Sequence, residues 1–316
     1  MNFEELALQE FPNIGETITR AQIKAVVTKY NIPSPAHIYS PNNRHSHGVY
    51  LFGQIEAREP AVVETDEEIE QRISDRYESM EIFIEAVAAN TVNSLIIAGA
   101  PGLGKSYGVN KVLHRVNGGE YGYVFHRGYI RATHLFRLLW ENRLKGQTIV
   151  LDDTDSLFDD STALNILKAA LELKETRMIG WGSEKDFTDQ DGETIPRYFD
   201  YEGSIIFLTN LPFSELAQGT GKHAPHLSAL ESRSLVLDLK IKTKREYMIK
   251  IKQTIKAGML TEKGLTNDEA DLIYNFMNTN IDKLKELSIR MCEKITALYL
   301  MDKENWVKLA TTVCLK

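Results

Sequence analysis

The sequence contains few cysteines and no long apolar run, and each absence excludes a class of protein. Only Cys292 and Cys314 are cysteines among 316 residues, and they lack the paired spacing of a zinc site. We expect both to be reduced residues of a helical core. No run approaches the roughly 18 consecutive apolar residues of a membrane span. The acidic start, residues 1–5, also lacks the basic and then apolar layout of a signal peptide. The expected location is the cytoplasm, with no membrane partner.

Acidic residues outnumber basic ones, but they are unevenly distributed. The formal net charge is −7, and residues 55–86 alone hold eleven acidic and three basic side chains. The remainder of the chain is close to neutral and can carry local basic faces. The net charge therefore does not exclude a nucleic-acid partner.

A glycine-rich segment organises the rest of the chain. Its sequence, Gly99-Ala100-Pro101-Gly102-Leu103-Gly104-Lys105-Ser106, fits the phosphate-loop pattern G-x-x-x-x-G-K-[ST]. An apolar strand is expected before it at 94–98 and a helix after it at 107–116, which is the context that the motif requires. Such a loop binds phosphate oxygens through its backbone N–H groups at a helix N-terminus. We expect the loop residues and Tyr107 to bind a nucleoside triphosphate, with Lys105 at the β- and γ-phosphates and Ser106 on Mg²⁺.

Strand and helix patterns alternate after this loop, which predicts an α/β fold with a parallel sheet. The expected strands are 121–125, 147–151, 203–209 and 235–239, and the expected helices are 133–143 and 161–174. From residue 242 the apolar spacing is helical only, so we expect an α/β domain over 66–241 and a helical domain over 242–316.

The first 54 residues are expected to form a small separate module, joined by a linker at 55–65. A capping-box pattern at 19–22 predicts one of its helices, and residues 48–52 predict a strand. This pattern fits either part of a winged-helix-like fold or a docking domain for a protein partner. A second capping-box pattern at 65–68 predicts the start of a long amphipathic helix that leads to the phosphate loop.

Two carboxylates follow the apolar strand that ends at Leu151. A parallel sheet delivers them to the edge where ligands bind, so we expect Asp152 to hold Mg²⁺ through water and Asp153 to act as general base. The alternative is an acidic turn, since Asp155, Asp159 and Asp160 follow.

Two further polar residues lie beside apolar strands. Asn210 follows the strand at 203–209 and is expected to hydrogen-bond the attacking water or the γ-phosphate, unless it caps a turn. Arg233 precedes the strand at 235–239. It either pairs with an acidic neighbour or reaches the γ-phosphate bound to a neighbouring subunit.

The order of these motifs resembles the AAA+ ATPases over roughly residues 65–316. The resemblance implies a P-loop NTPase AAA+ core with a C-terminal helical lid, and ATP and Mg²⁺ as ligands. It further implies that Asn210 is sensor 1 and that Arg233 is an arginine finger acting in trans. Leu287–Met291 is similar to sensor 2, which implies that Arg290 reaches the γ-phosphate in its own subunit; the alternative is an ordinary surface arginine.

The resemblance also points to one branch of the family. Asp152-Asp153 departs from the usual Asp-Glu, but the pair is familiar in the branch of helicase loaders and transposition ATPases. Ser232-Arg233-Ser234 resembles the finger motif of clamp-loader subunits, and the motifs look similar to AAA+ proteins of tailed bacteriophages. A phage-encoded protein would act in the host cytoplasm.

Two segments are candidates for contact with a substrate. Arg127, Tyr129 and Arg131 follow a strand where the family places its central-pore loop, and Tyr129 is suited to stack on a base or grip a polypeptide. Packing in the core is the alternative for Tyr129. Residues 177–182 and 196–200 are expected to pair as a hairpin inserted before the sensor 1 strand, which some DNA-acting branches carry; a surface loop without function is the alternative.

The implied function is an ATPase that forms a homo-oligomer, as a hexameric ring or spiral. It would couple ATP hydrolysis to remodelling DNA or a DNA-bound complex of the replication type. Two alternatives remain open, a protein-remodelling chaperone of the unfoldase type and a slow nucleotide-dependent switch. The shorter side chain of Asp153 motivates the second alternative, because it moves the carboxylate away from the attacking water.

Overall fold

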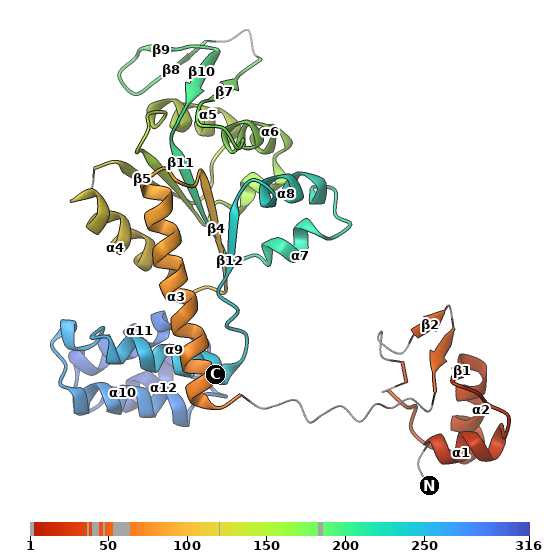
Figure 1. Cartoon of the computed structure of the whole chain (residues 1–316). Coiled ribbons are helices and arrows are strands. Elements are labelled where there is room, and N and C mark those ends of the chain that lie inside the picture. Colours follow the sequence, from red (N-terminus) through yellow and green to blue (C-terminus); the bar gives the residue numbers. More distant parts are fainter. Residues whose placement is uncertain are drawn as a thin grey trace. The chain divides into compact units, whose positions relative to one another are not determined.

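The computed structural model describes residues 3–36, 38–39, 44–46, 48–52, 64–119, 121–182 and 186–316. The chain divides into two compact units, Met1–Glu64 and Thr65–Lys316 (Figure 1). Most of the linker expected at 55–65 lies outside the described residues. Within the described ranges, no helix has both the length and the apolar character needed to cross a membrane.

The first unit is a small α+β module built on a three-stranded antiparallel sheet of order β1-β3-β2. Helix α2 begins as expected, because the Thr19 side chain and Gln22 form the capping box. The buried core of the module includes Ile18, Ile23 and Val26. Its elements are α1 (Phe3–Glu10), β1 (Thr17–Thr19), α2 (Arg20–Tyr30), β2 (Arg44–Ser46) and β3 (Val49–Leu51).

The second unit is built on a five-stranded parallel sheet of order β12-β4-β11-β6-β5. The long helix α3 (Asp66–Ala88) precedes this sheet and starts at the expected capping box of Thr65 and Glu68. The strands are β4 (Ser94–Ala98), β5 (Tyr123–Arg127), β6 (Thr148–Asp152), β11 (Ser204–Thr209) and β12 (Leu235–Asp238).

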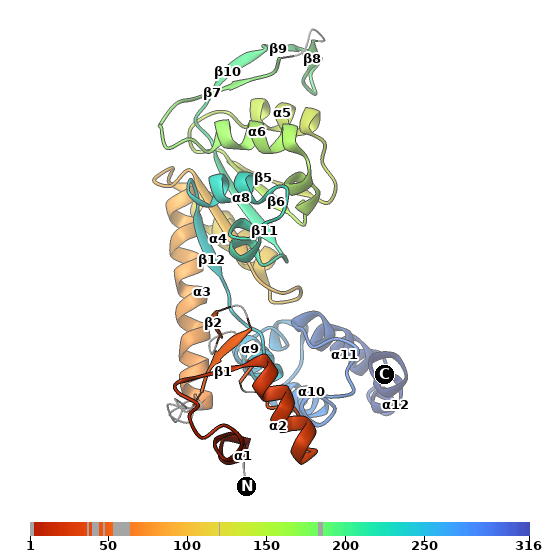
Figure 2. The ribbon, with the colours of Figure 1, turned by 90° about the vertical axis from the view of Figure 1, so that its right-hand side faces the viewer.

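Helices cover both faces of this sheet (Figures 1 and 2). Alternate strand residues point to opposite faces, so Ile96 packs in one buried cluster with α5, α6 and α8, while Leu95 and Ile97 pack in another with α3 and α4. The helices after α3 are α4 (Lys105–Asn117), α5 (Ala132–Glu141), α6 (Ser161–Ala170), α7 (Phe213–Ala217) and α8 (Ala224–Glu231), with a 3₁₀ turn η2 at Asp155–Asp159.

The chain ends in a helical lid with its own buried cluster. Cys292 and Cys314 are both buried and free in this cluster, as expected. The lid comprises α9 (Lys244–Lys256), η3 (Thr261–Lys263), α10 (Asn267–Thr279), α11 (Ile289–Met301) and α12 (Trp306–Cys314). The predicted fold class is confirmed: an α/β P-loop core with a parallel sheet, a C-terminal helical lid and a small N-terminal α+β module.

The predicted hairpin is also present. Strand β7 (Arg177–Gly180) pairs antiparallel with β10 (Tyr198–Tyr201). Beyond it, β8 (Phe187–Thr188) pairs with β9 (Thr194–Ile195).

Several predicted boundaries differ from those of the structure by one to four residues, and two of these differences have a local cause. Strand β5 begins at Tyr123 rather than at residue 121, because Gly122 adopts a left-handed backbone with φ of +79°. Helix α6 ends at Ala170 rather than at residue 174. The Asn93 side chain donates to the carbonyls of Glu172 and Lys174 (3.1 and 3.2 Å) and holds that segment in a turn.

Candidate functional site

The glycine-rich loop connects β4 to α4 at the carboxyl end of the sheet. Gly102 and Gly104 take left-handed backbone angles, with φ of +73° and +83°, which favour glycine. Gly104 is the N-cap of α4, and this helix end has no side-chain cap. Its first N–H groups therefore face the loop, where the helix dipole favours an anion such as phosphate.

Lys105 lies inside the loop and is only 7% exposed. Its Nζ donates hydrogen bonds to the carbonyls of Gly99 and Ala100 and, at 2.8 Å, to Oδ1 of Asn210. Burial lowers the pKa of Lys105 to about 8, an effect that the carboxylates of Asp153 and Asp152 partly oppose. A phosphate anion in the loop would supply the negative charge that this buried ammonium lacks.

Ser106 and Asp152 form an oxygen-rich pair beside the loop. The Ser106 Oγ donates to Oδ1 of Asp152 at 3.0 Å, and Asp152 is 6% exposed at the end of β6. A hydroxyl and a carboxylate are suitable ligands for Mg²⁺. The second oxygen, Oδ2, accepts a hydrogen bond of 3.2 Å from Nε of Arg127, which β5–β6 pairing places directly opposite Asp152.

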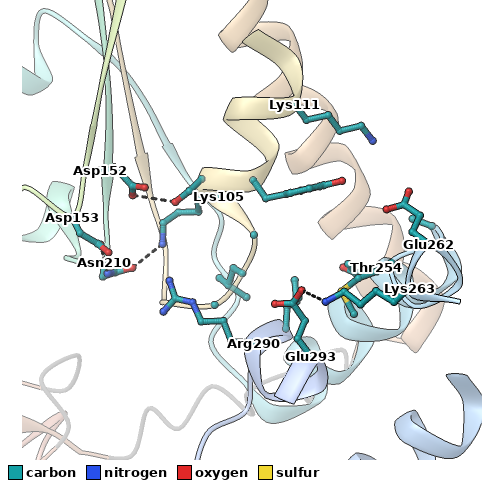
Figure 3. A pocket seen from close by; sticks show the side chains of 18 residues that line it. Lys105, Lys111, Asp152, Asp153, Asn210, Thr254, Glu262, Lys263, Arg290 and Glu293 are labelled. Atoms are coloured by element: carbon teal, nitrogen blue, oxygen red, sulfur yellow. Dashed lines mark hydrogen bonds and ion pairs between the residues drawn. The ribbon is translucent and has the colours of Figure 1, made fainter. Parts of the chain in front are cut away.

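Asp153 and Asn210 are brought together from neighbouring strands. The Asn210 Nδ2 donates to Oδ1 of Asp153 at 2.8 Å, so its amide bridges Asp153 and Lys105 (Figure 3). Asp153 has a left-handed backbone with φ of +53°, and its N–H donates to the carbonyl of Leu208 in β11. Such an angle is strained for a residue other than glycine, and strained residues are common at functional sites.

Asp155 contacts the residue before Asn210, a contact that sequence reasoning missed. Its Oδ1 accepts a hydrogen bond of 2.7 Å from the hydroxyl of Thr209, the residue before Asn210. Burial raises the pKa of Asp155, and the Thr209 hydrogen bond opposes that change. The sequence indicates Asp155 only as part of an acidic turn.

A cavity of about 530 Å³ joins the phosphate loop to the lid. The N–H of Ile289 in the lid donates to the carbonyl of Gly102 at 3.0 Å, and Arg290 extends from α11 toward Lys105 (Figure 3). Tyr107, whose side chain is exposed, also lines the cavity. Apart from Ile289 and Arg290, the lid side of the cavity carries no recognisable motif and was not predicted; these other residues are Thr254, Ala257, Met259, Glu262, Lys263 and Glu293.

Helix α3 contacts the phosphate loop through Tyr77, another contact without a sequence signal. The Tyr77 hydroxyl donates to the carbonyl of Leu103 at 2.6 Å. The Nζ of Lys250 in lid helix α9 lies 3.2 Å from the centroid of the Tyr77 ring. One side chain thus connects the loop, α3 and the lid.

Arg233 does not line this cavity. It precedes β12, in which Leu235 pairs with Leu95, and so lies at the end of the sheet opposite the phosphate loop. Its Nη1 donates to the carbonyl of Ala229 at 2.8 Å, and its Nε lies 3.6 Å from a carboxylate oxygen of Glu172. Within one subunit, the structure does not bring Arg233 together with the other candidate residues.

The candidate substrate segment after β5 has mixed contacts. Tyr129 is 71% exposed, so it does not pack in the core. Arg131 is exposed, whereas Arg127 contacts Asp152 as described above. Tyr129 and Arg131 are therefore open to an outside partner, while the exposed Arg127 side chain is also paired with Asp152.

The fold and site define an α/β protein of the P-loop type with a C-terminal helical lid. No protein-family model matches the chain. It is 34% identical over 255 residues to the uncharacterized 36.7 kDa protein in the nrdC-mobD intergenic region of Enterobacteria phage T4, covering 79% of this chain and 77% of that protein. The chain belongs to the family of this phage T4 protein.

Solved structures with lower similarity include two bacterial proteins. The RuvB Holliday junction branch migration motor of Thermotoga maritima is 15% identical with a TM-score of 0.41, over 79% of this chain and 69% of that one. NtrX from Brucella abortus in complex with ADP is 13% identical with a TM-score of 0.38, over 71% and 48% of the two chains.

Proposed function

We propose that this protein is an AAA+ ATPase that hydrolyses ATP with Mg²⁺ and acts as a homo-oligomer on DNA or on a DNA-bound complex. The observation that supports the ATPase is the convergence of Lys105, Ser106, Asp152, Asp153 and Asn210 at the sheet edge, beneath a lid that carries Arg290.

Each residue has a role that follows from its position. Lys105 and the loop N–H groups hold the phosphates, and Ser106 with Asp152 holds Mg²⁺, which neutralises phosphate charge when bound. Asp153 orients the attacking water, and Asn210 exchanges its present bonds for the water or the γ-phosphate.

The position of Arg233 supports the proposal of an oligomer. Arg233 lies too far from its own phosphate loop to act there, because it precedes β12 whereas the loop follows the parallel strand β4, so the length of the sheet lies between them. A guanidinium at this position serves as a finger only for a neighbouring subunit, so hydrolysis would depend on assembly.

The proposed substrate rests on two features. The motifs resemble those of helicase loaders and clamp loaders, and the exposed Tyr129 and Arg131 combine an aromatic ring with a cation. That combination suits a nucleic-acid strand, because rings stack on bases and guanidinium groups contact phosphates.

A slow nucleotide-dependent switch is the second candidate, and the contact between Asn210 and Asp153 favours it. This hydrogen bond occupies the carboxylate oxygen that would otherwise face the attacking water. A protein that binds ATP tightly without turnover would match the switch rather than the ATPase.

The test combines nucleotide binding, turnover and mass measurement. We expect Lys105→Ala to abolish ATP binding, while Lys308→Ala, an exposed lysine on α12, leaves it unchanged. We also expect single-stranded or duplex DNA, but not unfolded protein, to stimulate turnover in a salt-dependent manner. Stimulation by unfolded protein alone would favour the chaperone. Mass measured with and without ATP tests assembly.

A further inference from the structure

The hairpin before β11 forms a well-packed arm, which we define as residues 177–182 and 186–201. Its inner face buries Ile179 and Phe199, and the Phe199 ring lies 5.1 and 5.3 Å from those of Phe136 and Trp140 in α5. Figures 1 and 2 show the arm beyond α5 and α6, at the end of the second unit away from the lid. The arm is therefore anchored to the core, and it does not line the nucleotide cavity.

The tip of the arm is also ordered by its own contacts. The Asp189 carboxylate accepts hydrogen bonds from the N–H groups of Asp191 and Glu193, at 3.1 and 2.9 Å. The Gln190 side chain donates to Glu141 in α5 at 3.3 Å. These contacts hold the tip in one conformation, which reduces the entropy that a docking partner must overcome.

The outer face of the arm exposes two large apolar side chains that the fold does not need there. Met178 and Tyr198 are 67% and 64% exposed. A Cβ atom at Gly180 would lie 2.6 Å from the Tyr198 ring, so this ring lies directly against the strand and presents its other side outward. Methionine and tyrosine are enriched at protein interfaces, where they act as anchors.

Acidic side chains outnumber basic ones in the arm. It contains five acidic side chains and two basic ones, the buried Arg177 and Arg197, and Arg197 lies 3.5 Å from Asp186. Asp191, Glu193 and Asp200 are exposed. A surface of this charge repels nucleic-acid phosphates and attracts a basic surface.

We propose that the arm is a docking site for a partner protein with a basic surface. This partner binds the apolar pair Met178 and Tyr198 and the exposed carboxylates of Asp191, Glu193 and Asp200, which we call the acidic rim. The arm contacts the protein component of a DNA-bound complex rather than the DNA. This inference adds a partner site to the proposed function, and it does not require that the protein hydrolyse ATP.

The test uses the full chain and a defined probe, a fluorescent helical peptide of about 20 residues made of lysine and leucine, long enough to be helical. A glutamate and leucine peptide and a DNA duplex serve as reference probes. We expect the basic peptide to bind, more weakly at high salt, and the two reference probes not to bind the arm.

Two arm variants and two matched controls locate the binding. Met178→Ser with Tyr198→Ser removes the apolar pair, and Asp191→Asn, Glu193→Gln and Asp200→Asn remove the acidic rim. We expect each variant to weaken peptide binding at least tenfold with unchanged thermal unfolding. The controls remove two exposed apolar side chains or three exposed carboxylates from the lid, namely Met301→Ser with Val313→Ser, and Asp268→Asn with Asp271→Asn and Glu304→Gln.

The remaining outcomes each overturn the inference. Equal loss in the lid controls would show attraction to overall charge, and loss of DNA binding in the arm variants would make the arm a nucleic-acid site. A change in mass would make it an interface between copies of this chain. ATP turnover is measured on the same samples, so that the two proposals can fail independently. Peptide binding that depends on the arm in a protein without turnover would contradict the proposed ATPase function and leave the proposed docking site intact.

Discussion

The N–H of Ile289 in the lid donates a hydrogen bond of 3.0 Å to the carbonyl of Gly102 in the phosphate loop. Ile289 packs against the buried cluster of the helical lid, whereas Gly102 belongs to the loop that follows β4 in the α/β core. Any movement of the lid relative to the sheet must therefore break this bond or move the loop with it. The contact provides a direct mechanical link between the nucleotide cavity and the lid.

Substitution at Gly102 tests this link. A Cβ there would lie 2.5 Å from the Cβ of Ser288, and the residue has a φ of +73°. We expect Gly102→Ala to lower the free energy of unfolding by more than the roughly 1–3 kcal/mol of backbone strain alone, and to weaken nucleotide binding. Gly264→Ala is the control, because Gly264 has a φ of +88° and no atom within 4 Å of its Cβ position. Urea unfolding measures the loss of stability in both variants. An equal loss in Gly102→Ala and Gly264→Ala would show that backbone strain alone accounts for it, without a contribution from Ser288.

Arg127 and Mg²⁺ are expected to compete for Asp152. The Arg127 side chain is 64% exposed, and such ion pairs contribute about 0.2–1 kcal/mol. Arg127→Gln should therefore tighten Mg²⁺ binding in the presence of ATP by a factor of about 1.5 to 5. Calorimetric titration measures this affinity, and Arg131→Gln is the control from the same segment. Weaker Mg²⁺ binding in Arg127→Gln would instead indicate that the arginine supports the metal site.

Local patterns were sufficient to predict much of the fold. The phosphate loop has its strand, glycine turn and helix within about 24 consecutive residues, so the expected context could be checked directly in the sequence. The polar turn at 190–192 between two segments likewise predicted the pairing of β7 with β10, which lie close in the chain.

Contacts between distant segments could not be predicted. The pairing of Arg127 with Asp152 depends on the order of strands in the sheet, which no single strand encodes. Tyr77 reaches Leu103 only because α3 packs on α4. The end of α6 depends on Asn93, which comes from the segment before β4. The roles of the candidate residues in hydrolysis remain predictions.

The trans role of Arg233 predicts recovery of activity in mixtures. Arg233→Ala should reduce turnover by about 10³-fold or more, with ATP affinity nearly unchanged. Lys105→Ala retains its Arg233 and should supply it to the intact loop of an Arg233→Ala neighbour. In an equal mixture, about a quarter of the head-to-tail interfaces would be active.

Phosphate release from co-assembled mixtures measures this recovery. Lys145→Ala removes a different cation from the cavity that Arg233 lines, and should keep near wild-type turnover. Mixed assemblies that remain inactive would argue against a trans finger.

The hydrogen bonds of Glu246 lead us to expect that the stability of the protein depends on pH, independently of nucleotide. It accepts hydrogen bonds from Arg72 in α3 at 2.8 Å and from the N–H groups of Lys242 and Thr243 at 2.9 and 2.7 Å. Burial alone would raise its pKa, but these hydrogen bonds outweigh burial and lower the pKa from 4.5 to about 2. Because the folded-state pKa is the lower one, Glu246 contributes its full stabilisation above pH 4.5, and this contribution is lost as the pH falls toward 2.

Glu246→Gln should therefore destabilise the protein in a pH-dependent manner. At pH 7 we expect the free energy of unfolding to fall by about 1–3 kcal/mol, because the neutral amide no longer accepts charged hydrogen bonds. The difference from wild type should shrink between about pH 4.5 and pH 2, where wild-type Glu246 becomes protonated. Glu304→Gln, at an exposed position in the lid, should follow wild type throughout. Urea unfolding across this pH range measures both variants, and a constant difference for Glu246→Gln would show that packing, rather than charge, determines the effect.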